Sequence, residues 1–310
     1  MKVTIAFPGQ GTQYVGMGKD FIDTNFFDKA NQAAGYDLKQ IMLEGPAEVL
    51  KLTENTQPAI VAHSLMLFEQ LKVILASKHL EVEQVLGHSV GEYAALAAAG
   101  ALSFEDAVKA VHFRGRFMQE ASPAGKGTMY AILKQEEATI REACAAVSTI
   151  EETVSPANFN EPAQIVISGD KSACEKAIKW MEEKTQGRVK AIELQVSAPF
   201  HCALMKPAEL KLQTILSECK FNKLRIPYVA NIDAKKYGID TPAELIKENL
   251  LKQVCGSVLW TQSIQTMSNQ SLIIECGPGK VLAGLIKKIN PSIKVISLDS
   301  ETGFSEVEAL

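Results

Sequence analysis

The sequence has little that would bind a metal, form disulfides or enter a membrane. Its six cysteines include no Cys-x-x-Cys pair, and none of its five histidines has metal-ligand spacing to another ligand residue. We therefore predict buried free thiols and no metal site. The apolar run at the N-terminus is too short for a signal peptide, and no stretch is long enough to span a bilayer. These absences predict a cytoplasmic protein with no membrane partner.

Positive charge is also in the minority. The chain has 32 Lys and Arg residues against 36 Asp and Glu residues, and its formal net charge of −4 argues against nucleic acid as the main partner. With 46% hydrophobic and 22% charged residues, the composition is that of an ordinary globular protein. A length of 310 residues suffices for one large α/β domain or for one domain that carries an insertion.

One stretch carries the strongest functional pattern. An apolar run over 82–86 predicts a strand, residues 87–91 read Gly-x-Ser-x-Gly, and residues 92–99 predict a helix. Gly-x-Ser-x-Gly alone also occurs in ordinary turns, but a strand before it and a helix after it indicate a nucleophile elbow. Its glycines let strand and helix approach closely, and the helix N-terminus directs N–H groups at an oxyanion. We predict that Ser89 is a nucleophile.

The remaining pattern predicts two units. Two helical stretches, the second over 58–76 with His63 in the core, precede the elbow. Strand, helix, strand, strand, helix and strand are then predicted at 129–133, 136–147, 149–158, 164–168, 171–184 and 189–196. This βαββαβ order is the ferredoxin-like arrangement. We predict an α/β-hydrolase-like domain with a parallel sheet core, made of residues 1–125 and 198–310, and an inserted ferredoxin-like subdomain over 126–197.

A serine nucleophile needs a general base, for which imidazole is best suited at neutral pH. After Ser89 the chain offers only His112 and His201. His112 lies inside a helix that Ser103 caps, which suits a packing or surface residue. His201 lies in a loop where the chain re-enters the large domain, and such loops often carry catalytic groups. We predict a Ser89–His201 dyad whose imidazole is oriented by a backbone carbonyl.

Arg114 falls on the apolar face of the same helix, between Val111 and Met118. A guanidinium on that face needs a fixed anionic partner, because burying an unpaired charge costs several kcal/mol. Two interpretations remain open from the pattern: an internal Asp or Glu, or a substrate carboxylate that the guanidinium binds through two parallel hydrogen bonds.

The motifs together resemble a known family. They are Phe7–Gln13, Gly87–Tyr93, Arg114-Gly115 with Met118-Gln119, Val196–His201, Asn231-Ile232-Asp233 and Glu275–Leu282. Over essentially its whole length the chain resembles the malonyl-CoA:acyl carrier protein transacylases, including freestanding acyltransferases that serve some polyketide synthases.

The resemblance implies a role for each matching residue. Ser89 would be the nucleophile, His201 the base and Arg114 the partner of the malonyl carboxylate. The backbone N–H groups of Gln10 and Val90 would form the oxyanion hole, and the backbone carbonyl of Gln253 would orient His201. The residues that would line the substrate site are Met118, Asn158 and Phe200, with Gly279 nearby.

The implied reaction moves a malonyl group from malonyl-CoA to the phosphopantetheine thiol of an acyl carrier protein through a malonyl-serine, as in fatty-acid or polyketide synthesis. It implies no bound cofactor, since both thiols come with the substrates. Two rival functions are a serine acyl-thioester hydrolase or esterase with the same dyad, and a non-catalytic module that binds the carrier protein. A general hydrolase has no use for Arg114, and a non-catalytic module has no use for the Ser89–His201 pair.

Phe200 directly precedes the predicted base, and its ring should crowd the space beside the malonyl α-carbon. We expect a preference for malonyl over methylmalonyl thioesters that Phe200→Ser narrows, since one methyl group is worth only about 1–3 kcal/mol in a hydrophobic pocket. Competition between the two CoA thioesters measures the ratio, and an unchanged ratio in the variant would contradict the expectation.

Overall fold

The computed structural model describes residues 1–21, 25–123, 125–268, 271–299 and 301–310. Its larger sheet has six strands in the order β10-β9-β1-β2-β7-β8. All neighbours in it are parallel except β7 and β8. The strands are β1 (Lys2–Phe7), β2 (Glu81–Gly87), β7 (Tyr228–Val229), β8 (Lys236–Tyr237), β9 (Leu272–Glu275) and β10 (Lys294–Ser297).

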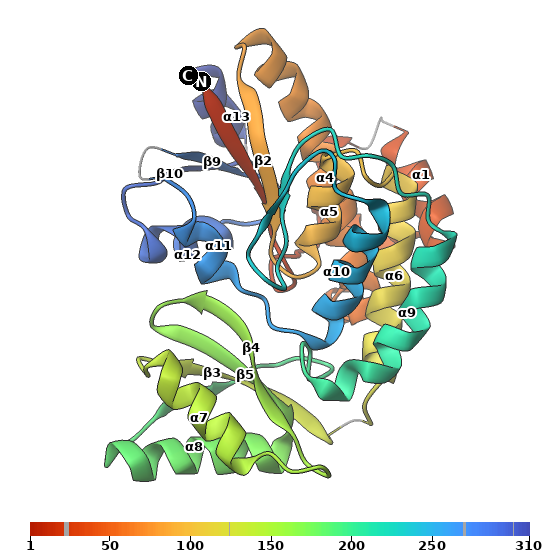
Figure 1. Ribbon diagram of the computed structural model, residues 1–310. Coiled ribbons are helices and arrows are strands. Elements are labelled where there is room, and N and C mark those ends of the chain that lie inside the picture. Colours follow the sequence, from red (N-terminus) through yellow and green to blue (C-terminus); the bar gives the residue numbers. More distant parts are fainter. Residues whose placement is uncertain (22–24, 124, 269–270, 300) are drawn as a thin grey trace.

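Helices cover both faces of this sheet (Figure 1). Side chains alternate along each strand, so Ile5 and Phe7 join the core under the N-terminal helices, while Ala6 joins a second core with Trp260 and Leu282. The helices of the first face include α1 (Phe26–Ala34), α2 (Leu38–Leu43), α3 (Ala47–Leu50), α4 (Thr53–Ser77), α5 (Gly91–Ala98), α6 (Phe104–Glu120), α9 (Lys206–Glu218) and α10 (Ala243–Cys255). The second face carries α11 (Trp260–Gln265) and α12 (Val281–Ile289).

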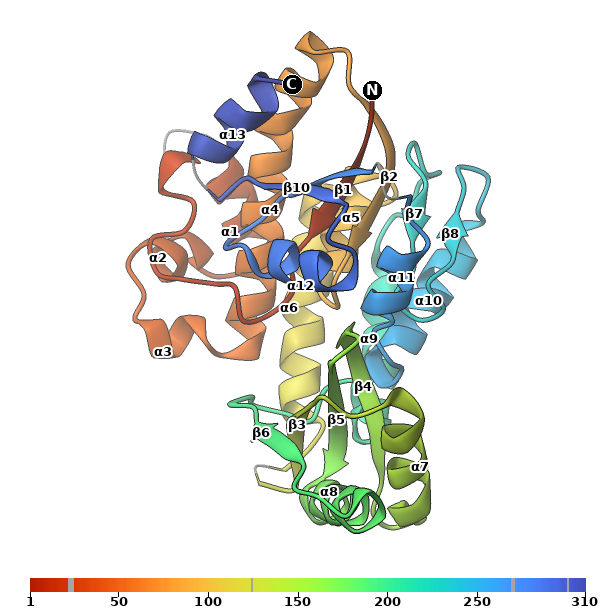
Figure 2. The same cartoon turned by 90° about the vertical axis from the view of Figure 1, so that its left-hand side faces the viewer.

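The chain closes with α13 (Glu301–Glu308), whose contacts are with β10 and α4. Short 3₁₀ turns occur at Lys19–Phe21 and Ala203–Met205. Both chain ends lie at the same end of the molecule, away from the second sheet (Figure 2).

The second sheet is antiparallel and has the order β4-β5-β3-β6. One of its faces packs on two helices around Ile132, Phe159 and Met181, and its other face joins the main core through Ala131 and Val166. Its elements are β3 (Gly127–Leu133), α7 (Glu137–Val147), β4 (Val154–Glu161), β5 (Gln164–Asp170), α8 (Lys171–Thr185) and β6 (Lys190–Glu193). Residue 124, beside the predicted first domain boundary, lies outside the described residues.

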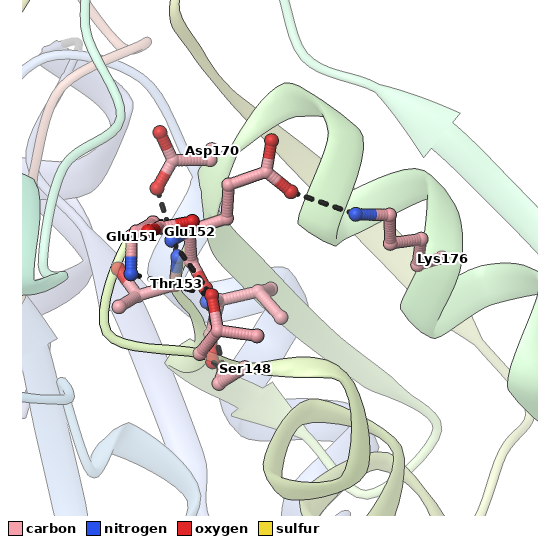
Figure 3. Close-up of polar contacts among 8 residues, drawn as sticks. Ser148, Glu151, Glu152, Thr153, Asp170 and Lys176 are labelled. Carbon is pink, nitrogen blue, oxygen red and sulfur yellow. Dashed lines mark hydrogen bonds and ion pairs between the residues drawn. The ribbon is translucent and has the colours of Figure 1, made fainter.

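The strand predicted at 149–158 begins later, at Val154, because the preceding residues form a turn that polar side chains hold (Figure 3). Asp170 accepts a hydrogen bond from the Thr153 N–H at 2.8 Å, and Ser148 Oγ donates to the Val154 carbonyl at 3.0 Å. Glu152 forms an ion pair with Lys176 of α8 at 2.7 Å. Residues 149–153, which the sequence pattern assigned to the strand, therefore belong to this turn.

The helical region before β2 also differs from the prediction, since α1 to α4 replace two helices. Gly35 ends α1 in the left-handed conformation, and α4 begins at Thr53 rather than near residue 58. Pro58 inside α4 has no N–H, so the Glu54 carbonyl lacks its usual donor. Tyr36 Oη and His112 Nδ1 lie 3.3 and 3.1 Å from that carbonyl and replace the donor.

The expectation that no stretch is long enough to span a bilayer is wrong for α4. This helix has 25 residues, and an 18-residue window in it has a mean hydropathy of 1.5. However, 67% of that window is buried inside the protein, packed chiefly against α6 and α5. A core helix reaches membrane-like apolarity because most of its surface packs against other helices and not against solvent.

His63 lies in this helix, is buried as predicted, and has an Nδ1 atom without a hydrogen-bond partner among the described residues. Burial lowers its pKa to about 4. As the pH falls from 6.5 toward 4, the unfolded chain therefore binds a proton that the folded chain does not, and stability is lost.

We expect His63 to contribute about 2 kcal/mol to the fall in unfolding free energy between pH 7 and pH 5. His63→Leu should remove that part, because leucine fills the site and does not titrate. Urea unfolding of both proteins at the two pH values measures it, and an equal pH dependence in the two would contradict the expectation.

Candidate active site

Ser89 stands on a strained turn between β2 and α5. Its φ is 52°, in the left-handed region that residues other than glycine rarely adopt. A Cβ at Gly87 would lie 2.0 Å from the Gly91 carbonyl carbon, and a Cβ at Gly91 would lie 2.2 Å from the Phe7 carbonyl oxygen. Only glycine fits at both positions, so strand and helix meet as closely as the sequence predicted.

The side chain of Asn231, just after β7, holds this turn at two points. Its Oδ1 accepts a hydrogen bond from the Ser89 N–H at 2.7 Å, and its Nδ2 donates to the Gly87 carbonyl at 2.6 Å. Each buried bond contributes about 1 kcal/mol, and a strained backbone conformation costs about 1–3 kcal/mol. The two bonds therefore offset much of the strain.

The structure brings Ser89 and His201 together. Ser89 Oγ lies 2.7 Å from His201 Nε2, and His201 Nδ1 lies 2.8 Å from the Gln253 carbonyl oxygen. A carbonyl can only accept, so Nδ1 carries the proton and Nε2 is the acceptor that faces the serine. The partner of the imidazole is a backbone carbonyl and not a carboxylate.

The environment of His201 keeps its imidazole neutral. The residue is 3% exposed. Burial, and after it the positive charge of Arg114, lowers the pKa of His201 to about 3. At neutral pH its Nε2 is therefore free to take a proton. His112 does not compete for this role, since its Nδ1 contacts the Glu54 carbonyl.

Arg114 reaches the site from α6 and is 1% exposed. Its Nη2 lies 3.3 Å from Ser89 Oγ and donates to Gln253 Oε1 at 2.9 Å, while Nη1 donates to Gln57 Oε1 at 2.8 Å. Its Nε has no partner among the described residues. The sequence required a negative partner, yet all three acceptors in this part of the structure are neutral.

The loop after β1 lies against the elbow. β1 and β2 are paired in parallel to their last residues, so their carboxyl ends lie at one edge of the sheet. A Cβ at Gly9 would lie 2.7 Å from the His88 carbonyl oxygen. Gln10 follows Gly9 directly, and Val90 is the N-cap of α5. The two predicted oxyanion-hole residues therefore belong to adjacent loops.

Two predicted substrate residues lie beside this machinery. Met118 is buried on α6, and its Sδ is 3.9 Å from Nε2 of Gln57, the residue that also contacts Arg114. Phe200 is buried and immediately precedes His201. Gly279 has φ 76°, and a Cβ on it would lie 3.7 Å from Thr12 in the loop after β1.

Asn158 is buried in β4, where it forms a bridge to Val258. Among the contacts of the described residues, none joins its side chain to the dyad or to Arg114. The β4 side chain that reaches the elbow is that of Asn160, whose Oδ1 lies 2.9 Å from His88 Nε2. A regular strand would place these two asparagines on the same face, because they are two positions apart. The register of β4 shifts between Phe159 and Glu161, and the sequence pattern did not reveal this irregularity.

Sequence reasoning assigned no role to four residues that join this network: Gln57, Glu92, Asn160 and Asn231. Asn231 and Glu92 lie in motifs of the family resemblance, and Gln57 and Glu92 also left a signal in the helical pattern. Gln57 lies three and four positions before the apolar Ile60 and Val61 of α4, so its polar side chain falls on a buried helix face. Glu92 is the second residue of α5, whose other residues are apolar or small apart from Tyr93, and it is fully buried.

A serine on a strained elbow, a neutral imidazole at hydrogen-bond distance and a nearby guanidinium together make an arrangement suited to acyl transfer through serine. The comparisons with known proteins agree with this class. The chain belongs to the acyl transferase domain family, whose model matches residues 4–288, and within it to the malonyl CoA-acyl carrier protein transacylases.

The relatives match over nearly their full length. The chain is 40% identical to a malonyl CoA-acyl carrier protein transacylase of Haemophilus influenzae, over 99% of this chain and 98% of that protein. An acyl carrier protein S-malonyltransferase structure from Vibrio cholerae matches with a TM-score of 0.89 and 40% identity, over 99% and 100% of the two chains. A malonyl-transacylase solved with its type II PKS acyl-carrier protein matches with a TM-score of 0.90 and 36% identity, over 100% and 99%.

We expect His201 to stay neutral throughout the physiological pH range, because burial lowers its pKa to about 3. In protein labelled with ¹⁵N-histidine, its two ring nitrogens should keep the chemical shifts of a neutral imidazole, protonated at Nδ1, from pH 8 down to pH 5. The spectrum of His201→Ala identifies the signals. A titration of His201 with a midpoint near 6.5 would contradict the assignment.

Proposed function

We propose that the protein transfers the malonyl group of malonyl-CoA to the phosphopantetheine thiol of an acyl carrier protein, through a malonyl ester on Ser89. The observation that carries the proposal is the position of Arg114. Its guanidinium lies 3.3 Å from the Ser89 hydroxyl and has only neutral acceptors among the described residues. A malonyl carboxylate would supply the negative charge that a buried guanidinium requires.

In the first half-reaction, Ser89 Oγ attacks the thioester carbonyl carbon of malonyl-CoA while its proton passes to His201 Nε2. A C–O bond forms and the carbonyl oxygen becomes an oxyanion. Collapse of this intermediate breaks the C–S bond, and the imidazolium returns the proton to the departing thiolate of coenzyme A. The products are malonyl-Ser89 and free coenzyme A, and the serine proton is now on the coenzyme A thiol.

The second half-reaction runs the same steps with another thiol. The carrier protein's phosphopantetheine thiol gives its proton to His201 and attacks malonyl-Ser89, and the serine leaves with that proton. The oxyanion of both steps would bind the N–H groups of Gln10 and Val90, where loss of one such donor costs about 3–4 kcal/mol. Adjacency of their loops at the carboxyl edge of β1 and β2 supports this assignment.

The partners follow from the same reaction and from the relatives' names. Coenzyme A thioester and phosphopantetheinylated carrier protein would bind as substrates, and neither half-reaction calls for a metal or redox cofactor. The carrier-protein complex among the structural neighbours supports a carrier partner for this chain. The route serves fatty-acid or polyketide synthesis, and we place the protein in the cytoplasm with no nucleic-acid or membrane partner.

The sheet topology supports the finer fold description. The antiparallel order β4-β5-β3-β6, with α7 and α8 packed on one face, fits a ferredoxin-like subdomain inserted at 126–197. The run of parallel strands from β10 to β7 fits an α/β-hydrolase-like domain made of residues 1–125 and 198–310.

The function is tested by competition between malonyl-CoA and acetyl-CoA for Ser89, with both acyl-serines quantified by intact-protein mass spectrometry. Wild type should form mainly malonyl-Ser89. Arg114→Ala should lose most malonyl transfer and still accept acetyl groups. The reason is that the Arg114 guanidinium, which we call the malonyl clamp, binds only the carboxylate. Arg114→Lys should recover part of the loss, since a point charge cannot form two parallel hydrogen bonds.

Ser89→Ala is the control and should carry neither label while it remains folded. Addition of the phosphopantetheinylated carrier protein should remove the malonyl group from the wild type. An equal malonyl-to-acetyl ratio in wild type, Arg114→Ala and Arg114→Lys would contradict the role of Arg114 as the malonyl clamp. Hydrolysis of malonyl-Ser89 without transfer to the carrier protein would instead indicate the rival hydrolase.

A further inference from the structure

Glu92 is a fully buried carboxyl group in the first turn of α5, three residues after Ser89. Its Oε2 accepts two hydrogen bonds, from Gln253 Nε2 at 2.7 Å and from the Asn231 N–H at 3.2 Å. Its Oε1 has no partner among the described residues. One oxygen of Glu92 therefore connects α5 to α10 and to the segment after β7, close to the elbow.

Gln253 occupies the centre of this network and is fully buried. The two shortest bonds of its Nε2 run to Glu92 Oε2 at 2.7 Å and to the Ser89 carbonyl at 2.9 Å. An amide nitrogen has two hydrogens, so these two acceptors use both. The amide oxygen is left on the opposite side, where it accepts from Arg114 Nη2 at 2.9 Å.

The orientation of this amide matters because a guanidinium has donors only. If the Gln253 amide turned over, its NH₂ group would face Arg114, donor against donor, and its oxygen would face the acceptor oxygen of Glu92. Arg114 would then lose one of its neutral acceptors and its fixed position beside Ser89. A buried polar group without a partner costs about 1–3 kcal/mol.

We propose that Glu92 is a positioning residue that fixes the Gln253 amide, and through it holds Arg114 where it binds the acyl carboxylate. The inference rests on the proposed function, because it concerns the malonyl clamp of the same site. Glu92 does not touch the acyl group, and its contribution is the reach and acceptor character of one oxygen.

The negative charge of Glu92 is not required for this role. Oε2 accepts a hydrogen bond whether or not a proton is carried on Oε1, which has no partner. Burial raises the pKa of Glu92 to about 7, so both states exist near neutral pH and both leave Oε2 as an acceptor. A glutamine at this position can present the same oxygen, whereas an aspartate is one methylene too short to reach Gln253.

The experiment compares Glu92→Gln with Glu92→Asp in the competition between malonyl-CoA and acetyl-CoA for Ser89 at pH 8. Glu92→Gln should keep the malonyl-to-acetyl ratio within about threefold of wild type, and Glu92→Asp should lower it at least about tenfold. In an Arg114→Ala background, Glu92→Asp should change the ratio no further, because the two residues act on one step.

Glu275 provides a matched control. It is also a fully buried glutamate, and it accepts hydrogen bonds from the Leu282 and Ala283 N–H groups at the start of α12. Glu275→Asp should lower the unfolding free energy and leave the malonyl-to-acetyl ratio of the folded fraction unchanged. This separates a general loss of packing from the specific effect on Arg114.

An unchanged ratio in folded Glu92→Asp would overturn the proposal, as would a larger loss in Glu92→Gln than in Glu92→Asp. If circular dichroism shows that Glu92→Asp does not fold, the malonyl-to-acetyl ratio of Gln253→Met is measured instead. Methionine keeps the backbone carbonyl that orients His201 and removes the amide, so the ratio should fall, and an unchanged ratio would overturn the proposal. Absence of malonyl-Ser89 in the wild type would instead refute the proposed function.

Discussion

The close approach of the β2 and α5 backbones at the elbow is the constraint on which the site depends. No side chain beyond hydrogen fits at Gly87, which meets the Gly91 backbone, or at Gly91, which meets the Phe7 carbonyl of β1. Between them Ser89 has a left-handed conformation. That conformation lifts the hydroxyl out of the strand toward His201. The strain is tolerated because Asn231, from a segment 142 residues away, binds the turn through both ends of its amide.

Burial gives the site its electrostatic character. Removed from water, His201 stays neutral at physiological pH, so its Nε2 is unprotonated and can accept the serine proton. Arg114 remains charged because its intrinsic pKa is so high. The hydrogen-bond acceptors of the guanidinium are neutral dipoles, the amides of Gln57 and Gln253 and the Ser89 hydroxyl. Such dipoles hold a cation in place without neutralising it, so its charge stays available to an anionic acyl group.

Much of the architecture is visible in the sequence because it is local. The glycine spacing of the elbow, the Ser103 cap and the apolar spacing around His63 each lie within one or two turns of chain. Where long-range contacts decide, sequence reasoning was less accurate. α4 continues through Pro58 because Tyr36 and His112 supply donors from elsewhere, and β4 begins late because Asp170 holds the turn before it.

The sequence by itself determined which reactive groups are present: a glycine-framed serine, two later histidines and an arginine on an apolar helix face. The serine, the arginine and His201 lie in motifs that identify the family. Only the tertiary structure decided how these groups are connected. Gln253 touches the backbone of Ser89 and the side chains of His201, Arg114 and Glu92 at once. No spacing along the chain encodes those contacts, because the residues come from four separate elements. Their distances and hydrogen-bond directions exist only after the sheets and helices have packed.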